Sequence, residues 1–299
     1  MSSPVLFRIV AATLLLLFAS PVWARLDVVA TTSSMGMLAR VVGGEAVQVS
    51  VLAPPDRDAH HLQARPRMLA ALRRADLVVA VGAELEVGWL PAALQGAGNP
   101  RVNPGRPGYF EAAAQMPLLG AGAAADRSQG DVHPHGNPHI QLDPERMMTA
   151  AVALAKRMAM LAPHDAPRFA ANAERFAQAV GARVPAWRSA AKSAPGVVFH
   201  HQDGDYLAAF LGVPVLGYIE PLPGIPPTAR HLQALVQSLA GHKGVILRAD
   251  FAPPQGADLV ARATGWPSRA LPLEPPLDAD TDRWIAFIDR WVQAIATDP

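Results

Sequence analysis

The chain has 299 residues, a formal net charge of +1 and no cysteine. The near-zero net charge argues against a nucleic-acid partner, and the absence of Cys excludes both disulfide bonds and thiolate metal ligands. Ten His occur beside only three Tyr, which points to a role for some of the histidines.

The first 24 residues are typical of a secretory signal. Arg8 is the only charge before an apolar run at 9–19, Pro21 breaks the run, and Val22-Trp23-Ala24 places small residues where a signal peptidase cleaves. We expect cleavage after Ala24, which leaves about 275 residues (299 minus 24). An uncleaved membrane anchor is the alternative, but the run is short for a transmembrane span.

The first half of the mature chain alternates strand-like and helix-like segments. The cluster Thr31-Thr32-Ser33-Ser34 is a helix N-cap signal, and Gly43-Gly44 is a helix stop signal. The pattern predicts strands at 26–30, 47–52 and 77–81, and helices at 35–42 and 67–74. Strands separated by crossover helices in this order predict a parallel sheet.

The middle of the chain predicts a loop followed by two helices. Residues 120–136 are rich in Gly, Ala and polar residues without an apolar period, which favours a mobile surface loop. We expect a helix from Pro144 to Leu161, with Asp143 as its N-cap, and a longer one from about Ala166 to Ala191. Pro185 puts the end of the longer helix in question, since an internal Pro kinks or ends a helix. That helix is either a linker between two lobes or one more packing helix of a single domain.

The second half repeats the α/β rhythm. Strands are predicted at 196–199, 213–218 and 244–247, and helices at 206–211, 230–239, 255–264 and 280–296. The predicted fold class is α/β, with two lobes that each contain a parallel sheet, joined by a long linker helix. The corresponding division is a signal peptide at 1–24, an N-terminal lobe at 25–165, a linker helix at 166–192 and a C-terminal lobe at 193–299.

Three histidines lie in separate loop-like segments. They are His60 in Asp58-Ala59-His60-His61, His139 in Asn137-Pro138-His139-Ile140, and His201 in Phe199-His200-His201-Gln202. His60 and His201 each follow the carboxyl end of a predicted strand, where open parallel sheets bind ligands. The wide spacing excludes a helical HExxH pair. Three neutral imidazoles with a carboxylate form a good tetrahedral zinc site, so Zn²⁺ is the ion we expect.

Several segments resemble the periplasmic solute-binding proteins of zinc and manganese ABC importers, the ZnuA/TroA-like group. The resemblance covers nearly all of the mature chain, and Asn137-Pro138-His139-Ile140 with Leu142-Asp143-Pro144 is its most specific part. The other matching segments are Val28-Val29-Ala30-Thr31-Thr32-Ser33, Asp58-Ala59-His60-His61-Leu62 with Pro66, Ala75-Asp76-Leu77-Val78-Val79 with Gly82 and Glu84-Leu85-Glu86, and Glu220-Pro221 with Gly224-Ile225-Pro226-Pro227-Thr228.

The resemblance implies a ligand set. The distance to Pro66 selects His60 rather than His61, and the distance to Tyr206 selects His201 rather than His200, although Gln202-Asp203-Gly204-Asp205 departs from the family pattern there. With His139 these make three ligands. The family often supplies an Asp about ten residues after a Thr-Gly pair. Here Thr264-Gly265 is present without that Asp, which leaves Glu274 as the nearest carboxylate, Asp250 and Asp278 as rivals, and water as a further option.

The resemblance also implies a function. We expect a periplasmic protein that captures Zn²⁺ and delivers it to a membrane ABC permease, acting as a monomer with no enzymatic activity and no nucleic-acid partner. Another periplasmic zinc carrier is a conceivable donor of the ion. His133 and His135 resemble the His-rich loop of many zinc members, and we expect that loop to assist capture without forming the main site. The alternatives are a zinc-dependent hydrolase, because three His with an open position also suit catalysis, and a periplasmic metal buffer or adhesin.

Overall fold

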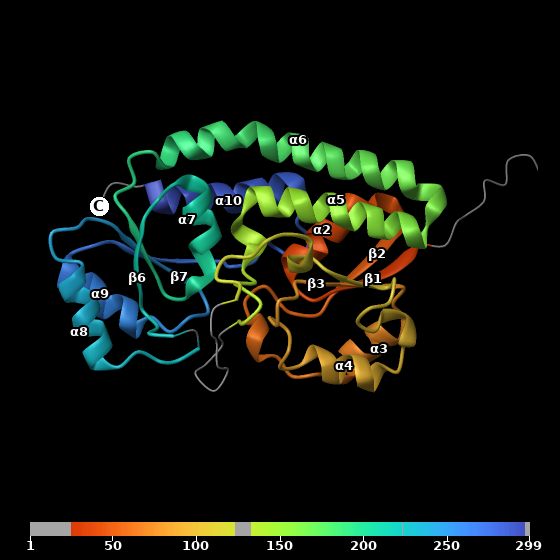
Figure 1. The fold of residues 1–299 in the computed structure, drawn as a ribbon, viewed down its shortest axis with the longest axis horizontal. Coiled ribbons are helices and arrows are strands. Elements are labelled where there is room, and N and C mark those ends of the chain that lie inside the picture. Colours follow the sequence, from red (N-terminus) through yellow and green to blue (C-terminus); the bar gives the residue numbers. More distant parts are fainter. Residues whose placement is uncertain (1–24, 123–132, 223, 297–299) are drawn as a thin grey trace, which may run out of the picture.

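Two four-stranded parallel sheets form the framework of the protein, and both have the same strand order. The computed structural model describes residues 25–122, 133–222 and 224–296. The first sheet has the order β2-β1-β3-β4 and the second the order β6-β5-β7-β8. In each sheet the chain moves from an inner strand, β1 or β5, to the edge strand on one side, and then crosses over to the other inner strand, β3 or β7. The strand order therefore reverses between the two inner strands, and ligands bind to parallel sheets at such a reversal. The predicted α/β fold with two parallel-sheet lobes is confirmed (Figure 1).

The N-terminal lobe consists of the first sheet and its covering helices. Its strands are β1 (Leu26–Ala30), β2 (Val47–Val51), β3 (Leu77–Ala80) and β4 (Tyr109–Glu111), and its α-helices are α2 (Ser33–Gly43), α3 (Pro66–Arg74), α4 (Leu90–Ala97) and α5 (Pro144–Leu161). Thr32 caps α2 by accepting from the Met35 N–H, as the Ser/Thr cluster predicts. Ala30 pairs with both Val51 and Val79, so the carboxyl ends of β1, β2 and β3 meet at one edge.

The C-terminal lobe repeats this arrangement. Its strands are β5 (Val197–Phe199), β6 (Val215–Tyr218), β7 (Val245–Ala249) and β8 (Ser268–Leu271), and its α-helices are α7 (Asp205–Leu211), α8 (Ala229–Ser238), α9 (Gln255–Thr264) and α10 (Thr281–Ala296). Phe199 pairs with both Tyr218 and Leu247. Residues 200 and 201 therefore emerge at the carboxyl edge of this sheet, as His60 does shortly after β2.

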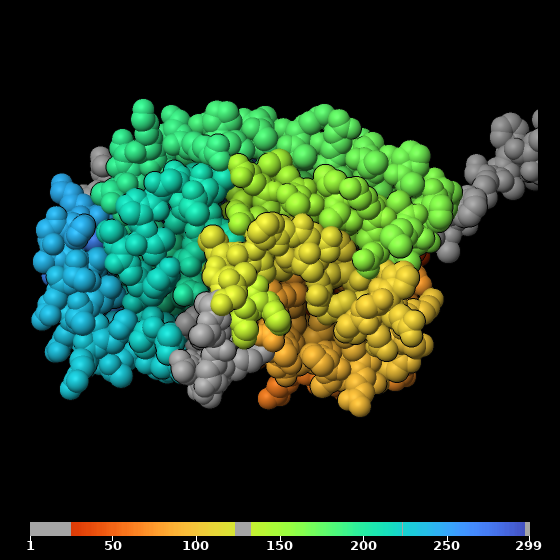
Figure 2. Space-filling view, viewed as in Figure 1, coloured from red at the N-terminus to blue at the C-terminus, as the bar shows by residue number. Residues whose placement is uncertain are grey.

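Helix α6 (Ala166–Ala191) runs the length of the molecule along one side of both lobes (Figures 1 and 2). The helix continues through Pro185 to Ala191, so the expected bounds hold even though an internal proline can end a helix. Trp187, two residues after Pro185, is 2% exposed and donates its indole N–H to Asp289 of α10 at 2.6 Å. This packing holds the last turns of α6 in place despite the backbone hydrogen bond that Pro185 cannot make.

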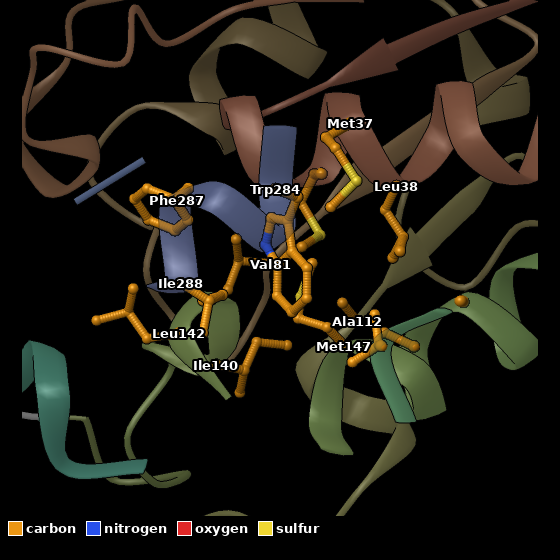
Figure 3. Close-up of a cluster of buried hydrophobic side chains, with 14 of the residues drawn as sticks. Met37, Leu38, Val81, Ala112, Ile140, Leu142, Met147, Trp284, Phe287 and Ile288 are labelled. Carbon is orange, nitrogen blue, oxygen red and sulfur yellow. The ribbon is translucent and has the colours of Figure 1, made fainter. Parts of the chain in front are cut away.

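One hydrophobic core extends through both lobes and limits their relative motion. Trp284 of α10 is fully buried, and Figure 3 shows it at the centre of a cluster with Met37 of α2 on one side and Ile140 on the other. Its ring centroid is 5.5 Å from that of Phe176 in α6. Opening the lobes widely would expose aromatic surface from the C-terminal helix, which is costly in water.

The structure adds three elements that the sequence did not predict. They are α4, β4 and β8, of which β4 and β8 are edge strands of three and four residues. Short edge strands carry little alternation, and their pairing depends on the neighbouring strand. None of the helices in the described part of the chain is both long and apolar enough to cross a membrane.

Candidate metal centre

His60 is held in position by the first turn of a short 3-10 helix (Ala59–His61) that follows β2. Asp58 caps this turn, because its Oδ1 accepts from the His60 backbone N–H at 2.9 Å. The same Oδ1 lies 2.7 Å from Nδ1 of the His60 ring. The carboxylate therefore fixes the protonated nitrogen at Nδ1 and leaves Nε2 with its lone pair facing the space between the lobes.

His139 lies in the loop after β4, immediately before a 3-10 helix (Ile140–Leu142), and it is 2% exposed. Its backbone N–H donates to Oδ1 of Asn137 at 2.9 Å. Asp143 then caps α5 by accepting from the N–H groups of Glu145 and Arg146, so the expected cap role of Asp143 is confirmed. The His-containing loop is thus fixed at both sides by side chain to backbone hydrogen bonds.

His201 follows β5, and its ring is oriented by a carboxylate from the neighbouring strand. Glu220, just after β6, places Oε2 at 2.9 Å from Nδ1 of His201 and Oε1 at 3.4 Å from Nε2 of His200. The backbone N–H of Glu220 donates to the His200 carbonyl at 3.0 Å, which locks the two segments together. As with His60, Nε2 of His201 is the nitrogen left facing the cavity.

The imidazole rings of the three predicted ligands lie close together between the lobes. Nε2 of His139 lies 3.1 Å from Nε2 of His201. The ring centroid of His60 is 5.1 Å from that of His139 and 5.7 Å from that of His201. A tetrahedral zinc ion with Zn–N distances of about 2.0–2.1 Å separates its nitrogen ligands by about 3.4 Å. His139 is shared by two groups of possible ligands, one with His60 and His133 and one with His201 and Asp203. A single ion bound by all three imidazoles would therefore draw His60 and His201 closer together.

His133 joins this group from the loop that precedes His139. Its Nε2 lies 3.2 Å from Nε2 of His60, and its ligand atom falls within 4.8 Å of those of His60 and His139. The sequence predicts an auxiliary role for His133, whereas the structure places its ring against a predicted ligand. His135 points elsewhere: its side chain is 72% exposed, with Nε2 at 3.8 Å from Glu84. Much of the predicted mobile loop lies outside the described residues, at 123–132.

The carboxylates considered for the fourth position have different surroundings. Glu274 lines the same cavity, but its Oε2 accepts from both the backbone N–H and the hydroxyl of Ser34, each at 2.6 Å. Asp250 is exposed after β7, and Asp278 is exposed and paired with Arg283. Neither is among the described residues that line the cavity. In this geometry Glu274 bridges the two lobes rather than approaching the histidines.

The three predicted histidine ligands line a cavity of about 270 Å³, together with Asp203 and Glu220. Burial and charged neighbours shift the pKa values of several of these residues. Burial, with the neighbouring His201, lowers the pKa of His139 well below its usual value, so this ring is neutral. Burial also lowers the pKa of His201, but the charge of Asp203 and the hydrogen bond to Glu220 outweigh it and raise that pKa to about 9. The pKa of Glu220 falls to about 2, because the hydrogen bonds from His200 and His201 outweigh burial. The metal-free site therefore contains a proton on His201.

Three carboxylates that lie beside the histidines were not identified as site residues from the sequence. Asp58 and Glu220 contact His60 and His201, and Asp203 places Oδ1 at 3.8 Å from Nδ1 of His139. Asp203 also forms a group that could hold a metal with His139 and His201, and its Oδ1 lies on the Nδ1 side of the His139 ring. The signal for Asp58 is its place two residues before His60. For Glu220 it is its place directly after a strand that neighbours the one preceding His201.

Comparison with known proteins identifies the family of the chain. The family model described as ZnuA, zinc-uptake complex component A, periplasmic, matches residues 28–298. The chain is 28% identical over 301 residues to the high-affinity zinc uptake system protein ZnuA of Yersinia pestis, covering 92% of each chain.

Two solved structures share the fold. A crystal structure of ZnuA has a TM-score of 0.74 at 22% identity, with 92% of this chain and 99% of that one covered. The solute-binding protein FpvC from Pseudomonas aeruginosa, in complex with Mn²⁺, has a TM-score of 0.76 at 21% identity, with 91% and 97% covered. With the family model matched over nearly the whole mature sequence, this chain belongs to the ZnuA family of periplasmic zinc-uptake components.

Proposed function

We propose that this protein captures Zn²⁺ in the periplasm and delivers it to an ABC permease. The observation that carries the proposal is the gathering of the His60, His139 and His201 rings between the lobes, with the rings of His60 and His201 each oriented by a carboxylate. Oriented imidazoles of this kind bind zinc tightly, because the outer carboxylates raise ligand basicity and fix the tautomer. Membership of a zinc-uptake family supports the same function.

We propose His133 as the fourth ligand in place of Glu274. His133 already lies at ligand spacing from His60, whereas Glu274 would have to leave two hydrogen bonds to Ser34 before it could reach an ion. A four-imidazole site favours zinc over manganese, since manganese prefers oxygen ligands and lies lower in the general order of stability. The ion is cargo in this scheme, so the protein binds and releases it without chemical change.

The proposed division of the chain follows the same logic. The lobes at 25–165 and 193–299 each supply part of the site, and the helix at 166–192 connects them. The shared core around Trp284 supports small lobe movements, so zinc entry and release would depend on loops more than on hinge opening. We also propose export through cleavage after Ala24 and action as a monomer.

The hydrolase alternative is disfavoured by membership of a family of transport components. Catalytic zinc sites also keep one position open for water, whereas in our proposal His133, 3.2 Å from His60, takes the fourth position. The buffer or adhesin alternative shares the same metal site, and it predicts zinc binding without transfer to a permease.

Metal analysis with competitive titration of the mature protein tests the proposal. We expect one tightly bound zinc per chain and preference for zinc over manganese in direct competition. His139→Ala should weaken zinc binding by more than about 100-fold, beyond what loss of a residue that orients a ligand causes. His242→Ala is a matched control, because His242 is exposed in the C-terminal lobe. Unchanged affinity in His139→Ala, or tighter manganese binding, would contradict the proposal.

A further inference from the structure

A second hollow lies beside the histidine cavity, on the surface of the N-terminal lobe between β2 and α3. It has a volume of about 540 Å³, and three arginines line it: Arg57, Arg65 and Arg67. All three are exposed, and the acidic residue Asp56 is also in the lining. Three positive charges against one negative charge leave a net charge of +2. We call this hollow the arginine pocket.

The arginines of the arginine pocket lack acidic partners in the part of the chain that the structure describes. Among residues with a described position, none forms an ion pair with Arg57, Arg65 or Arg67. Exposed arginines usually serve either solubility or binding of anions, and here they surround one concave site. Guanidinium groups bind carboxylates with two parallel hydrogen bonds, so several arginines in one hollow suit a ligand with several carboxylates.

The charge of the arginine pocket has a consequence for zinc itself. A hydrated Zn²⁺ ion is repelled by the arginines, so these residues would slow its approach from this side. An anionic complex of the same ion is attracted instead. The hollow is also within the size range of pockets that bind small molecules, and Leu62 and Met68 provide an apolar part of its lining.

His61 connects the arginine pocket to the metal centre. It lines both hollows, and its ring centroid is 6.0 Å from that of the predicted ligand His60. Its side chain is 62% exposed, so a ligand in the arginine pocket can reach the ring. An imidazole at this position can exchange with a carboxylate on the ion and then give way to His60.

We propose that the arginine pocket binds a small polycarboxylate that carries zinc as an anionic chelate, and that zinc passes from it through His61 to His60. In this exchange the carboxylate–zinc bonds break as imidazole–zinc bonds form, and the free polycarboxylate leaves with its charge. The inference rests on the proposed capture of zinc at the histidine cavity. It adds the chemical form in which the ion is accepted.

Citrate is the probe for a first experiment, which contains no metal. Isothermal titration measures citrate binding to the metal-free mature protein and to the variant Arg65→Glu/Arg67→Glu. The control Arg74→Glu/Arg106→Glu makes the same charge change at two exposed positions of the same lobe that do not line the hollow. We expect the pocket variant to bind citrate at least about tenfold more weakly and the control to resemble the wild type. No citrate binding by the wild type, or equal loss in both variants, would overturn the proposal.

Stopped-flow loading then compares two zinc sources, anionic zinc citrate and neutral zinc bis(glycinate). The pocket variant should load about tenfold more slowly than the control from zinc citrate, with no slowing from the neutral complex, and the difference should shrink as salt is added. His61→Gln should slow loading from zinc citrate while citrate alone still binds. Equal rates in the pocket variant and the control, or in His61→Gln and the wild type, would overturn the proposal. Failure of the wild type to load from either source would instead contradict zinc capture itself, and citrate binding without metal distinguishes the two failures.

Discussion

Glu220 orients His201 through the Nδ1 side of the ring, with Oε2 at 2.9 Å from Nδ1. The same carboxylate accepts from the Gly224 N–H at 3.0 Å, so it is held from both the strand end and the following loop. A carboxylate fixed in this way keeps Nε2 of His201 free to bind the ion.

The first prediction concerns this carboxylate. Glu220→Gln keeps the shape of the side chain but removes its charge, so zinc affinity should fall by about 10–100-fold. Competitive titration with a chromophoric chelator measures the change. Glu174→Gln is the control, because Glu174 is exposed on α6, far from the predicted histidine ligands in sequence, and accepts a hydrogen bond from Gln178. Equal affinities for the two variants would show that Glu220 does not orient the ligand.

The second prediction concerns protons released by zinc binding. The pKa of His201 in the metal-free protein is raised to about 9, above its ordinary value of 6.5. The protonated ring therefore stabilises the metal-free fold fully below pH 6.5, and this contribution is lost as the pH rises through about 9. Zinc requires the neutral ring, so apparent affinity should rise steadily from pH 6.5 to 9.

At pH 7.5 close to one proton should leave His201 on zinc binding, while His139, already neutral, releases none. Titration calorimetry in two buffers of different ionisation enthalpy counts these protons. Glu220→Gln should reduce the count, because it removes a group that raises the pKa of His201. Binding without proton release in the wild-type protein would contradict the assignment.

The third prediction separates the two candidates for the fourth ligand. His133→Ala should weaken zinc binding at equilibrium, since its Nε2 lies 3.2 Å from Nε2 of His60, whereas Glu274→Gln should leave the affinity nearly unchanged. His135→Ala is the control from the same loop, with an exposed side chain. The opposite ranking of the first two variants would identify Glu274 as the ligand. Slower loading without weaker binding in His133→Ala would restrict this residue to capture.

The fourth prediction concerns Glu274 and the stability of the metal-free protein. Burial raises the pKa of Glu274 to about 7, against an ordinary value of 4.5, although the hydrogen bonds from Ser34 partly oppose the shift. The protonated carboxyl is the form that the fold favours. Its contribution is therefore fully present below pH 4.5 and lost as the pH rises through about 7.

Glu274→Gln imitates the protonated form at every pH. The variant should match the wild type near pH 4.5 and exceed it at pH 8, by on the order of a few kcal/mol in the free energy of unfolding. Denaturant unfolding in the presence of a chelator, at both pH values, measures the difference. A variant that is less stable than the wild type at pH 8 would show that the ionised carboxylate contributes to the fold through Ser34.

The local sequence was sufficient to predict most of the framework. Helix α9 has the predicted bounds, Gln255–Thr264, and the strand and cap signals around Thr32 and Asp143 also hold. These signals are local, because apolar periodicity and capping depend on residues within a few positions of one another. The short edge strands β4 and β8 depend on distant partners, and the sequence did not predict them. The bounds expected for α6 hold, and only its passage through Pro185 was left in question by the sequence.

The candidate site also combines residues that the sequence identified with contacts that only the tertiary structure revealed. The sequence by itself pointed to His60, His139 and His201, because each lies in a distinctive loop and the family resemblance distinguishes it from an adjacent His or a nearby loop. Only the tertiary structure placed His133 against His60, Glu220 behind His201 and Glu274 on Ser34. These contacts join residues 19 to 240 positions apart. No local pattern encodes such distances, since the packing of two lobes around one core sets which side chains meet.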